Sequence, residues 1–187
     1  MQRFEMKQLF DVLDIPGPDL LLRDYGRRAF PLLEEKLWEV PLGHALILSF
    51  EGVSVMDTSF ADETVLELAL GLTDNKYGER LLILETPSSA TLDNVEGTIA
   101  RRKAKVALVV RARNTMRLVG HVEPNLQETW ELIREKGALT ARELADTLKL
   151  EINTASMRLR KLYDAHLLVR REEVTSSGRQ HVYGLPA

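Results

Sequence analysis

The chain has 187 residues, of which 44% are hydrophobic and 28% are charged, and its formal net charge is −3. This composition is sufficient to build a hydrophobic core and excludes a disordered chain. The absence of cysteine excludes disulfide bonds, thiolate nucleophiles and cysteine-ligated zinc or iron–sulfur sites. Residues 1–123 contain fifteen Lys and Arg against nineteen Asp and Glu, and residues 124–187 contain ten Lys and Arg against nine Asp and Glu. Only residues 124–187 therefore carry a net positive charge, and this charge is small.

The beginning of the chain has no apolar signal segment, and no apolar run approaches the length of a transmembrane helix. We therefore expect a cytoplasmic protein. The four histidines stand far apart, and no glycine-rich loop ends in the Gly-Lys-Ser/Thr that holds nucleotide and magnesium. Asp62 and Glu63 are adjacent, so they point to different helix faces and do not form an acid/base pair. We expect no metal, no cofactor and no enzymatic activity.

The N-terminal segment is ambiguous between strand and helix. We assign residues 1–12 to a strand or hairpin, ended by the Pro16-Gly17-Pro18 turn. Residues 20–38 are helical in pattern, but Gly26 and Pro31 interrupt them, which favours a regular helix from Phe30 with the proline at its first position. On this interpretation Arg23, Arg27 and Arg28 are solvated.

Three continuous apolar runs follow, at residues 45–50, 81–84 and 106–110, and each is typical of a strand buried on both faces. Helical patterns separate them. The first has apolar residues at Ala61, Val65, Leu68, Ala69 and Leu72, and the second at Leu92, Val95 and Ile99. This alternation predicts an α/β domain with a mainly parallel or mixed sheet and helices packed on it. Residues 116–119 are expected to add an edge strand.

The segment Phe50-Glu51-Gly52, followed by Asp57-Thr58-Ser59-Phe60-Ala61-Asp62-Glu63, leads from a strand into a helix. It resembles the STAS-like domain of unknown function, a relative of the STAS domain of anti-sigma factor antagonists. The resemblance runs from about residue 19 to residue 119, and we assign residues 1–121 to this domain. In the antagonists a partner kinase phosphorylates a serine in this turn, and the resemblance implies that Ser59 occupies the phosphoacceptor position.

Two interpretations of Ser59 remain open. A helix N-terminus has free N–H groups and a positive dipole end, which favour a phosphate. Phe60 replaces the glycine of the antagonist pattern, however, and the neighbouring Asp57, Asp62 and Glu63 would repel added negative charge. The alternative is that Thr58 and Ser59 are ordinary N-cap residues, which satisfy orphan amides at many helix starts.

The stretch from Thr140 to Leu162 predicts two consecutive helices. Thr140 and Glu143 form a capping-box pattern, so a helix should begin there, and its periodicity breaks at residues 149–152. Asn153 is expected to open the second helix, with Ala155, Leu159 and Leu162 facing inward. Its opposite face then carries Asn153, Thr154, Ser156, Met157, Arg160 and Lys161, with Arg158 on the flank. Short hydrogen-bonding groups, one apolar group and two cations suit the major groove of DNA, although a solvated amphipathic helix shows a similar pattern.

A β-hairpin is predicted after this helix, with strands at Leu167–Arg171 and Gln180–Tyr183 and a polar tip, Thr175-Ser176-Ser177-Gly178-Arg179. Residues 125–183 resemble a winged helix-turn-helix domain of prokaryotic regulators, a small α+β fold, and we assign residues 122–187 to it. The resemblance implies that Arg179 contacts DNA from the wing. It departs from the pattern at His166, where such domains commonly have glycine to turn out of the helix.

Two functional hypotheses follow. In the first, the protein is a transcriptional regulator that binds double-stranded DNA through the winged helix, with a STAS-like domain that senses or dimerises, and a homodimer is expected. In the second, it is a phospho-switched adaptor that docks a kinase or an anti-sigma-like protein at the turn formed by residues 57–63. The acidic balance of the first part and the modest basicity of the second motivate this alternative.

Overall fold

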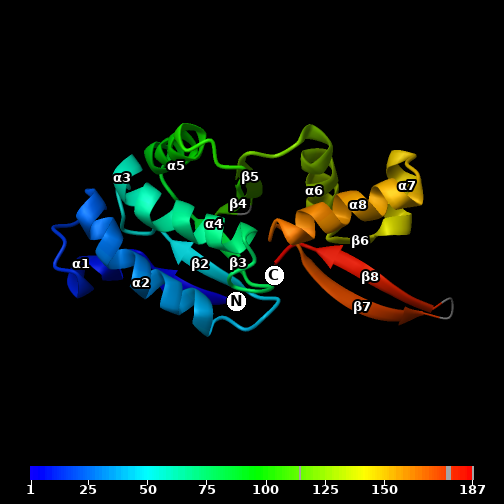
Figure 1. Ribbon diagram of the computed structural model, residues 1–187, viewed down its shortest axis with the longest axis horizontal. Coiled ribbons are helices and arrows are strands. Elements are labelled where there is room, and N and C mark those ends of the chain that lie inside the picture. Colours follow the sequence, from blue (N-terminus) through cyan, green and yellow to red (C-terminus); the bar gives the residue numbers. More distant parts are fainter. Residues whose placement is uncertain (114, 176–177, 187) are drawn as a thin grey trace.

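The computed structural model describes residues 1–113, 115–175 and 178–186. Its first part is an α/β domain built on a five-stranded sheet in the order β1-β2-β3-β4-β5 (Figure 1). The strands are Gln2–Glu5, Ala45–Ser49, Leu81–Glu85, Ala107–Ala112 and Thr115–Gly120. β1 to β4 are parallel and β5 is antiparallel to β4. The predicted α/β class, the three buried strands and the edge strand are therefore confirmed.

The N-terminal segment forms one strand and one short helix. β1 pairs in parallel with β2, and α1 (Gln8–Val12) follows it. The expected strand is confirmed, whereas a hairpin is wrong. The reason is that the apolar side chains of Met6 and Leu9 are fully buried in the core, which requires the chain to leave the sheet edge after Glu5.

Helix α2 (Arg23–Glu39) is longer than expected and contains Pro31 in its interior. A proline there costs about 3 kcal/mol. The inward face offsets this cost, because Ala29, Leu33 and Leu37 are fully buried. Glycine at position 26 also suits this packing, since a Cβ atom there would lie 3.0 Å from Cβ of Glu63 and 3.2 Å from Cα of Phe60. The prediction that the regular helix begins at Phe30 is therefore wrong.

The helical pattern between β2 and β3 forms one continuous helix with a change of winding. It consists of α3 (Thr58–Ala61), a π segment (Asp62–Leu66) and α4 (Glu67–Thr73). α5 (Ser89–Arg101) follows β3, and Ser88 caps it by accepting a hydrogen bond from the Thr91 N–H. Both helices are confirmed, but the periodicity did not predict the π segment.

The two faces of the sheet are covered by different parts of the chain. The helix face packs against α2 to α5 and consists of Leu46, Leu48, Leu82, Leu84, Leu108 and Val110. The C-terminal face consists of Ala45, Ile47, Leu81, Ile83, Val109 and Leu118, and these residues share one hydrophobic cluster with the C-terminal helices and hairpin. Strand residues alternate between the two faces, as the pleat of a β-sheet requires.

The C-terminal part is an α+β unit. Its helices are α6 (Pro124–Lys136), α7 (Ala141–Leu148) and α8 (Ile152–Asp164), and its strands are β6 (Ala138–Thr140), β7 (Val169–Thr175) and β8 (Gly178–Gly184). The strands form an antiparallel sheet in the order β6-β8-β7. The predicted helices and hairpin are confirmed, although α8 begins at Ile152 and not at Asn153. Ser176 and Ser177 of the predicted tip lie outside the described residues.

The chain passes from β5 into α6 through residues 121–123, and the domain boundary after residue 121 stays a prediction. Within the described ranges, no helix combines the length and the apolar character needed to cross a lipid bilayer.

Candidate nucleic-acid interface

The capping box at the start of α7 forms as predicted. The Thr140 hydroxyl accepts a hydrogen bond from the Glu143 N–H at 3.2 Å, and the Glu143 carboxylate accepts one from the Thr140 N–H at 2.8 Å. The hydrogen bond from the Thr140 N–H lowers the pKa of Glu143 most, and the one from the Thr140 hydroxyl lowers it further. These contacts fix the start of α7 and therefore the angle at which the chain enters the helix pair.

α8 presents two distinct faces. Ala155, Leu159 and Leu162 are fully buried, as predicted. The six residues predicted to read DNA lie away from this core: Thr154 is half-buried, and the exposed ones are Asn153, Ser156, Met157, Arg160 and Lys161. Met157 is 56% exposed and is the apolar side chain of this face. The structure thus brings these residues together on one open helix face.

The cations of α8 contact carboxylates of the same chain. Arg160 lies 3.5 Å from Asp164, one helical turn away, and Lys161 lies 3.3 Å from Glu123 at the entrance to α6. Arg158 on the flank contacts Glu128 at 3.0 Å, and its own side chain is mostly buried. Arg158 therefore ties α8 to α6, whereas Arg160 and Lys161 keep their side chains largely in solvent.

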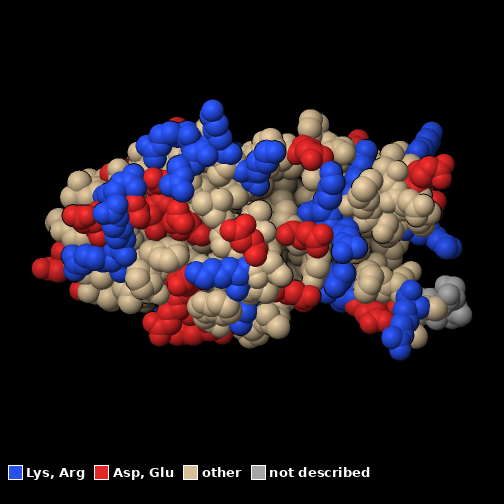
Figure 2. All heavy atoms as spheres, in the orientation of Figure 1, with Lys and Arg blue, Asp and Glu red and all other residues tan. Residues whose placement is uncertain are grey.

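The β7–β8 hairpin projects from the end of the molecule opposite α1 (Figure 1). Arg179 lies near its tip, with its Nε atom 3.4 Å from the Glu172 carboxylate. Val174 on the opposite strand is 80% exposed. Figure 2 shows that basic side chains are spread over this end of the molecule and interleaved with acidic ones, so the surface is mixed and not uniformly basic.

Arg142 is a residue that the sequence reasoning missed. It lies in the first turn of α7 and lines a groove of about 460 Å³ together with Arg179, Glu143 and Asp146. It makes no hydrogen bond or ion pair with the described residues. Its position could have been predicted, because the inward-facing Leu144 and Ala145 direct Arg142 away from the core.

His166 takes the conformation that glycine adopts in the resembled domains. Its φ is +57°, in the left-handed region. The side chain is 8% exposed, and its Nδ1 atom lies 2.8 Å from the carbonyl oxygen of Arg80 in the α/β domain. The turn out of α8 therefore forms with histidine at this position, and the imidazole provides a contact between the two parts of the chain that glycine could not make.

The turn that contains Ser59 is capped differently from the expectation. Asp57 is the N-cap: its carboxylate accepts hydrogen bonds from the Phe60 N–H at 2.7 Å and from the Leu22 N–H at 3.1 Å. The prediction that Thr58 and Ser59 are caps is therefore wrong, because a carboxylate one residue earlier already fills this role. Ser59 is half-buried, and its hydroxyl forms no hydrogen bond with the described residues.

Ser59 and the exposed face of α8 are far apart: in Figure 1, α3 lies in the half of the molecule that contains α1, and α8 lies in the other half. The site residues therefore form two separate regions, and phosphorylation of Ser59 stays a prediction.

Asp62 lies at the centre of a charged cluster beside this turn. It is 4% exposed, and its carboxylate contacts Arg23 at 2.9 Å, Arg102 at 3.0 Å and Arg101 at 3.6 Å. Glu63 contacts Arg23 and Arg27. Arg28 instead donates a hydrogen bond to the Leu13 carbonyl oxygen at 2.9 Å. The expectation that the three arginines of α2 are merely solvated is wrong, because the acidic π segment packs directly against this helix.

Neither the family models nor the curated proteins give a match to this chain. The two family resemblances therefore rest on their own residues alone. Across residues 1–113, 115–175 and 178–186, no group of three or more His, Asp or Glu side chains is arranged to hold a metal ion.

Proposed function

We propose that the protein is a DNA-binding transcriptional regulator in which α8 enters the major groove and the β7–β8 hairpin acts as the wing. The observation that carries this proposal is the open face of α8, where Asn153, Ser156, Met157, Arg160 and Lys161 are exposed together beside a projecting hairpin. A helix followed by a hairpin of this kind matches the docking geometry of helix-turn-helix readers.

The chemistry of this face suits direct readout. Asn153, Thr154 and Ser156 can exchange hydrogen bonds with base edges, and Met157 offers apolar contact to a thymine methyl group. Arg160 and Lys161 lie further along the same helix, where they can reach bases or phosphates. Arg179 and the additional Arg142 approach from the groove between α7 and the hairpin, which suits contacts with the phosphate backbone.

The ion pairs within the chain are compatible with this role. Arg160, Lys161 and Arg179 retain side-chain exposures of 76%, 50% and 79%. Exposed pairs of this kind contribute about 0–1 kcal/mol, so a DNA phosphate can replace the carboxylate at little cost. The acidic neighbours keep nonspecific affinity low, and the salt dependence of binding reports how many phosphates the cations neutralise.

The α/β domain serves sensing or dimerisation in this proposal. Its resemblance to the STAS-like domain supports the assignment. A homodimer would bind two half-sites about one helical turn apart, which greatly strengthens binding over a single module.

The test is a fluorescence-anisotropy titration against mixed genomic duplex fragments at two salt concentrations. We expect the wild-type protein to bind with a clear salt slope, and the variant Arg160→Ala/Lys161→Ala/Arg179→Ala to lose at least about tenfold in affinity, because three phosphate contacts are removed. The matched control is Lys103→Ala/Lys105→Ala/Arg113→Ala, which removes the same charge from exposed positions of the α/β domain. Equal losses in both variants would indicate a nonspecific charge effect and contradict the proposed interface.

The phospho-switched adaptor remains the second candidate, and one observation favours it. The Ser59 hydroxyl forms no hydrogen bond with the described residues and lies in the first turn of a helix, where a phosphate is stabilised by the helix dipole. Peptide mass spectrometry of protein from its native cells tests this candidate. This candidate fails if Ser59 carries no phosphate under any growth condition and if cells that carry the Ser59→Ala variant grow like wild-type cells under the same conditions.

A further inference from the structure

Lys161, in the last turn of α8, contacts a carboxylate that belongs to another helix. Its Nζ atom lies 3.3 Å from the carboxylate of Glu123, the N-cap residue of α6, and the two residues are 38 positions apart in the sequence. About half of each side chain is exposed. The contact therefore lies at the surface, on the face of α8 that the proposed function directs toward DNA.

The side chain of Glu123 does not cap its own helix. Among the described residues its carboxylate forms no cap hydrogen bond, although its backbone carbonyl accepts hydrogen bonds from the Leu126 and Gln127 N–H groups. At α7, by contrast, the side chains complete a capping box. The Glu123 carboxylate is thus directed to Lys161 and not to the orphan N–H groups at the start of α6.

The chain that leads from β5 to α6 fixes the backbone of Glu123. Gly120 ends β5 with a φ of +97°, and a Cβ atom there would lie 2.5 Å from the Val106 carbonyl oxygen. The same carbonyl oxygen accepts a hydrogen bond from the His121 N–H at 2.8 Å. Pro124 takes the first position of α6, where its ring restricts φ. Little backbone freedom therefore remains between the sheet and Glu123.

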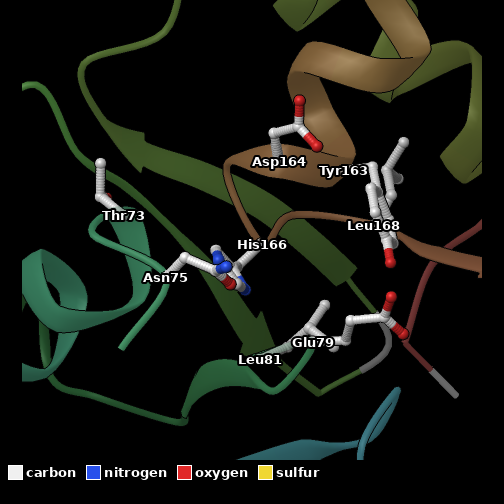
Figure 3. Close-up of a pocket in the computed structure, with 8 residues that line it drawn as sticks. All are labelled: Thr73, Asn75, Glu79, Leu81, Tyr163, Asp164, His166 and Leu168. Carbon is white, nitrogen blue, oxygen red and sulfur yellow. The ribbon is translucent and has the colours of Figure 1, made fainter. Parts of the chain in front are cut away.

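The end of α8, which carries Lys161, is fixed to the α/β domain at a different place. The Tyr163 hydroxyl points toward Glu79 (Figure 3), and burial together with the hydrogen bond to this carboxylate raises the pKa of Tyr163 to about 12. The tyrosine therefore remains a donor at neutral pH. Two residues after α8, His166 contacts the Arg80 carbonyl oxygen at 2.8 Å. The Lys161–Glu123 contact thus joins two fixed backbone positions, whereas many surface pairs must order two mobile partners.

The other two cations of the proposed DNA face have local partners. Arg160 contacts Asp164 one turn further along α8, and Arg179 contacts Glu172 within the hairpin. Pairs at these spacings stabilise the helix or the hairpin that contains them. The contact of Lys161 differs, because its carboxylate comes from outside α8 and the hairpin.

A carboxylate and a DNA phosphate offer a lysine the same kind of partner, an anionic oxygen. A phosphate bound at Lys161 would lie within a few ångströms of the Glu123 carboxylate, and two negative charges at that distance repel each other. DNA binding through Lys161 therefore has to displace Glu123.

We propose that the Lys161–Glu123 contact is autoinhibitory: in the free protein the Glu123 carboxylate occupies Lys161 in place of a DNA phosphate and lowers the affinity of α8 for DNA. This inference rests on the proposed function, because it requires Lys161 to contact DNA. Since exposed ion pairs are weak, the contact lowers the affinity by at most about fivefold.

The experiment is a double-mutant cycle on the full chain, in which DNA affinity is measured by fluorescence anisotropy at low salt with the same mixed genomic duplex fragments. The four proteins are the wild type, Glu123→Gln, Lys161→Ala and the double variant. We expect Glu123→Gln to raise the affinity by about three- to fivefold when Lys161 is present. In the Lys161→Ala background the gain should fall below about twofold, because no cation is left to release.

The matched control is Glu135→Gln. It removes the same charge from an exposed position near the other end of α6, where the carboxylate forms no hydrogen bond or ion pair with the described residues. We expect it to change the DNA affinity by less than about twofold. Glutamine keeps the length of the glutamate side chain in both variants, and thermal unfolding verifies that each variant is folded.

Three outcomes would overturn this inference while DNA binding itself stands. Glu123→Gln could behave like Glu135→Gln, so that the contact would not inhibit binding. Glu123→Gln could give the same gain with and without Lys161, so that the carboxylate would act by repelling DNA and not by occupying the lysine. Lys161→Ala could bind as tightly as the wild type, so that Lys161 would not contact DNA. If no duplex fragment binds the wild type or any variant, the proposed function fails and this inference fails with it.

Discussion

The helix face and the C-terminal face of the central sheet are equally apolar, but they are covered in different ways. The helix face is covered by α2 to α5, which connect the strands that they cover. The C-terminal face is covered by α6, α7, α8 and the hairpin, which follow the last strand and share a single cluster with it. The C-terminal unit is therefore held by more than the chain connection after β5, because one face of the five-stranded sheet forms part of its hydrophobic core.

The strongest test of this comparison is Trp130→Ala. Trp130 is fully buried in the cluster of the C-terminal face, and its Nε1–H donates to the Leu167 carbonyl oxygen at 3.3 Å. We expect a loss of about 3–5 kcal/mol in the free energy of unfolding, measured by urea denaturation. Because the core is shared, circular dichroism and the fluorescence of Trp38 in the α/β domain should report one common transition. Two separate transitions would show that the two parts unfold independently.

A second test compares matched substitutions on the two faces. Ile83→Ala removes a side chain from the C-terminal face, and Leu84→Ala removes one from the helix face; both residues are fully buried on the same strand. Each should cost about 2–5 kcal/mol. If Ile83→Ala costs far less than Leu84→Ala in urea denaturation, the C-terminal unit contributes little to the stability of the sheet.

On the helix side, Asp62→Ala tests the charged cluster. Its removal leaves three guanidinium groups without their shared carboxylate. We expect the free energy of unfolding to fall by about 3 kcal/mol, which is the lower end of the range for breaking a buried ion pair, because the arginines are half-exposed. Chemical denaturation at neutral pH measures this. Asp146→Ala, an exposed carboxylate of α7, is the control and should change stability by less than about 0.5 kcal/mol.

The capping box gives a smaller effect with a defined pH dependence. Thr140→Ala should cost about 1 kcal/mol. The pKa of Glu143 is lowered in the folded state, so its carboxylate contributes stability above the unfolded pKa of about 4.3 that is lost as pH falls through the folded value. Glu143→Gln should therefore differ from wild type at pH 7 and approach it near pH 3 in urea denaturation. A difference that stays constant with pH would contradict this assignment.

The smallest effect is expected at the exposed pairs of the DNA face. Arg179→Ala breaks only an exposed contact with Glu172, so it should change the free energy of unfolding by less than about 1 kcal/mol. Thermal denaturation measures this, and a larger loss would mean that the hairpin depends on Arg179 for its structure.

The elements that sequence reasoning predicted are those with local signals. The apolar runs of β2, β3 and β4, the capping box of Thr140 and the inward face of α8 depend on neighbours in sequence, and all are confirmed. The parallel pairing of β1 and the continuous helix α2 were missed, because distant packing decided both. The local signals around Gly26 and Pro31 pointed to an interrupted helix.

The site residues follow the same division. The exposed face of α8 could be predicted because helical periodicity fixes it once the buried face is known. The partners of the charged residues could not: Lys161 contacts Glu123, Arg23 contacts Asp62, and His166 contacts the Arg80 carbonyl, each across a large separation in sequence.

The π segment between α3 and α4 has a consequence for insertions and deletions. A π turn holds one residue more than an α turn, so the segment 62–66 is equivalent to an α-helix with a single inserted residue. Deleting one residue within it would therefore restore regular α winding and leave the following helix in nearly the same orientation. The same deletion at the start of α4 would rotate the residues after it by about 100°, and the buried Ala69 and Leu72 would leave the core. The π segment is therefore the place where this helix can lose one residue without changing which of its faces is buried.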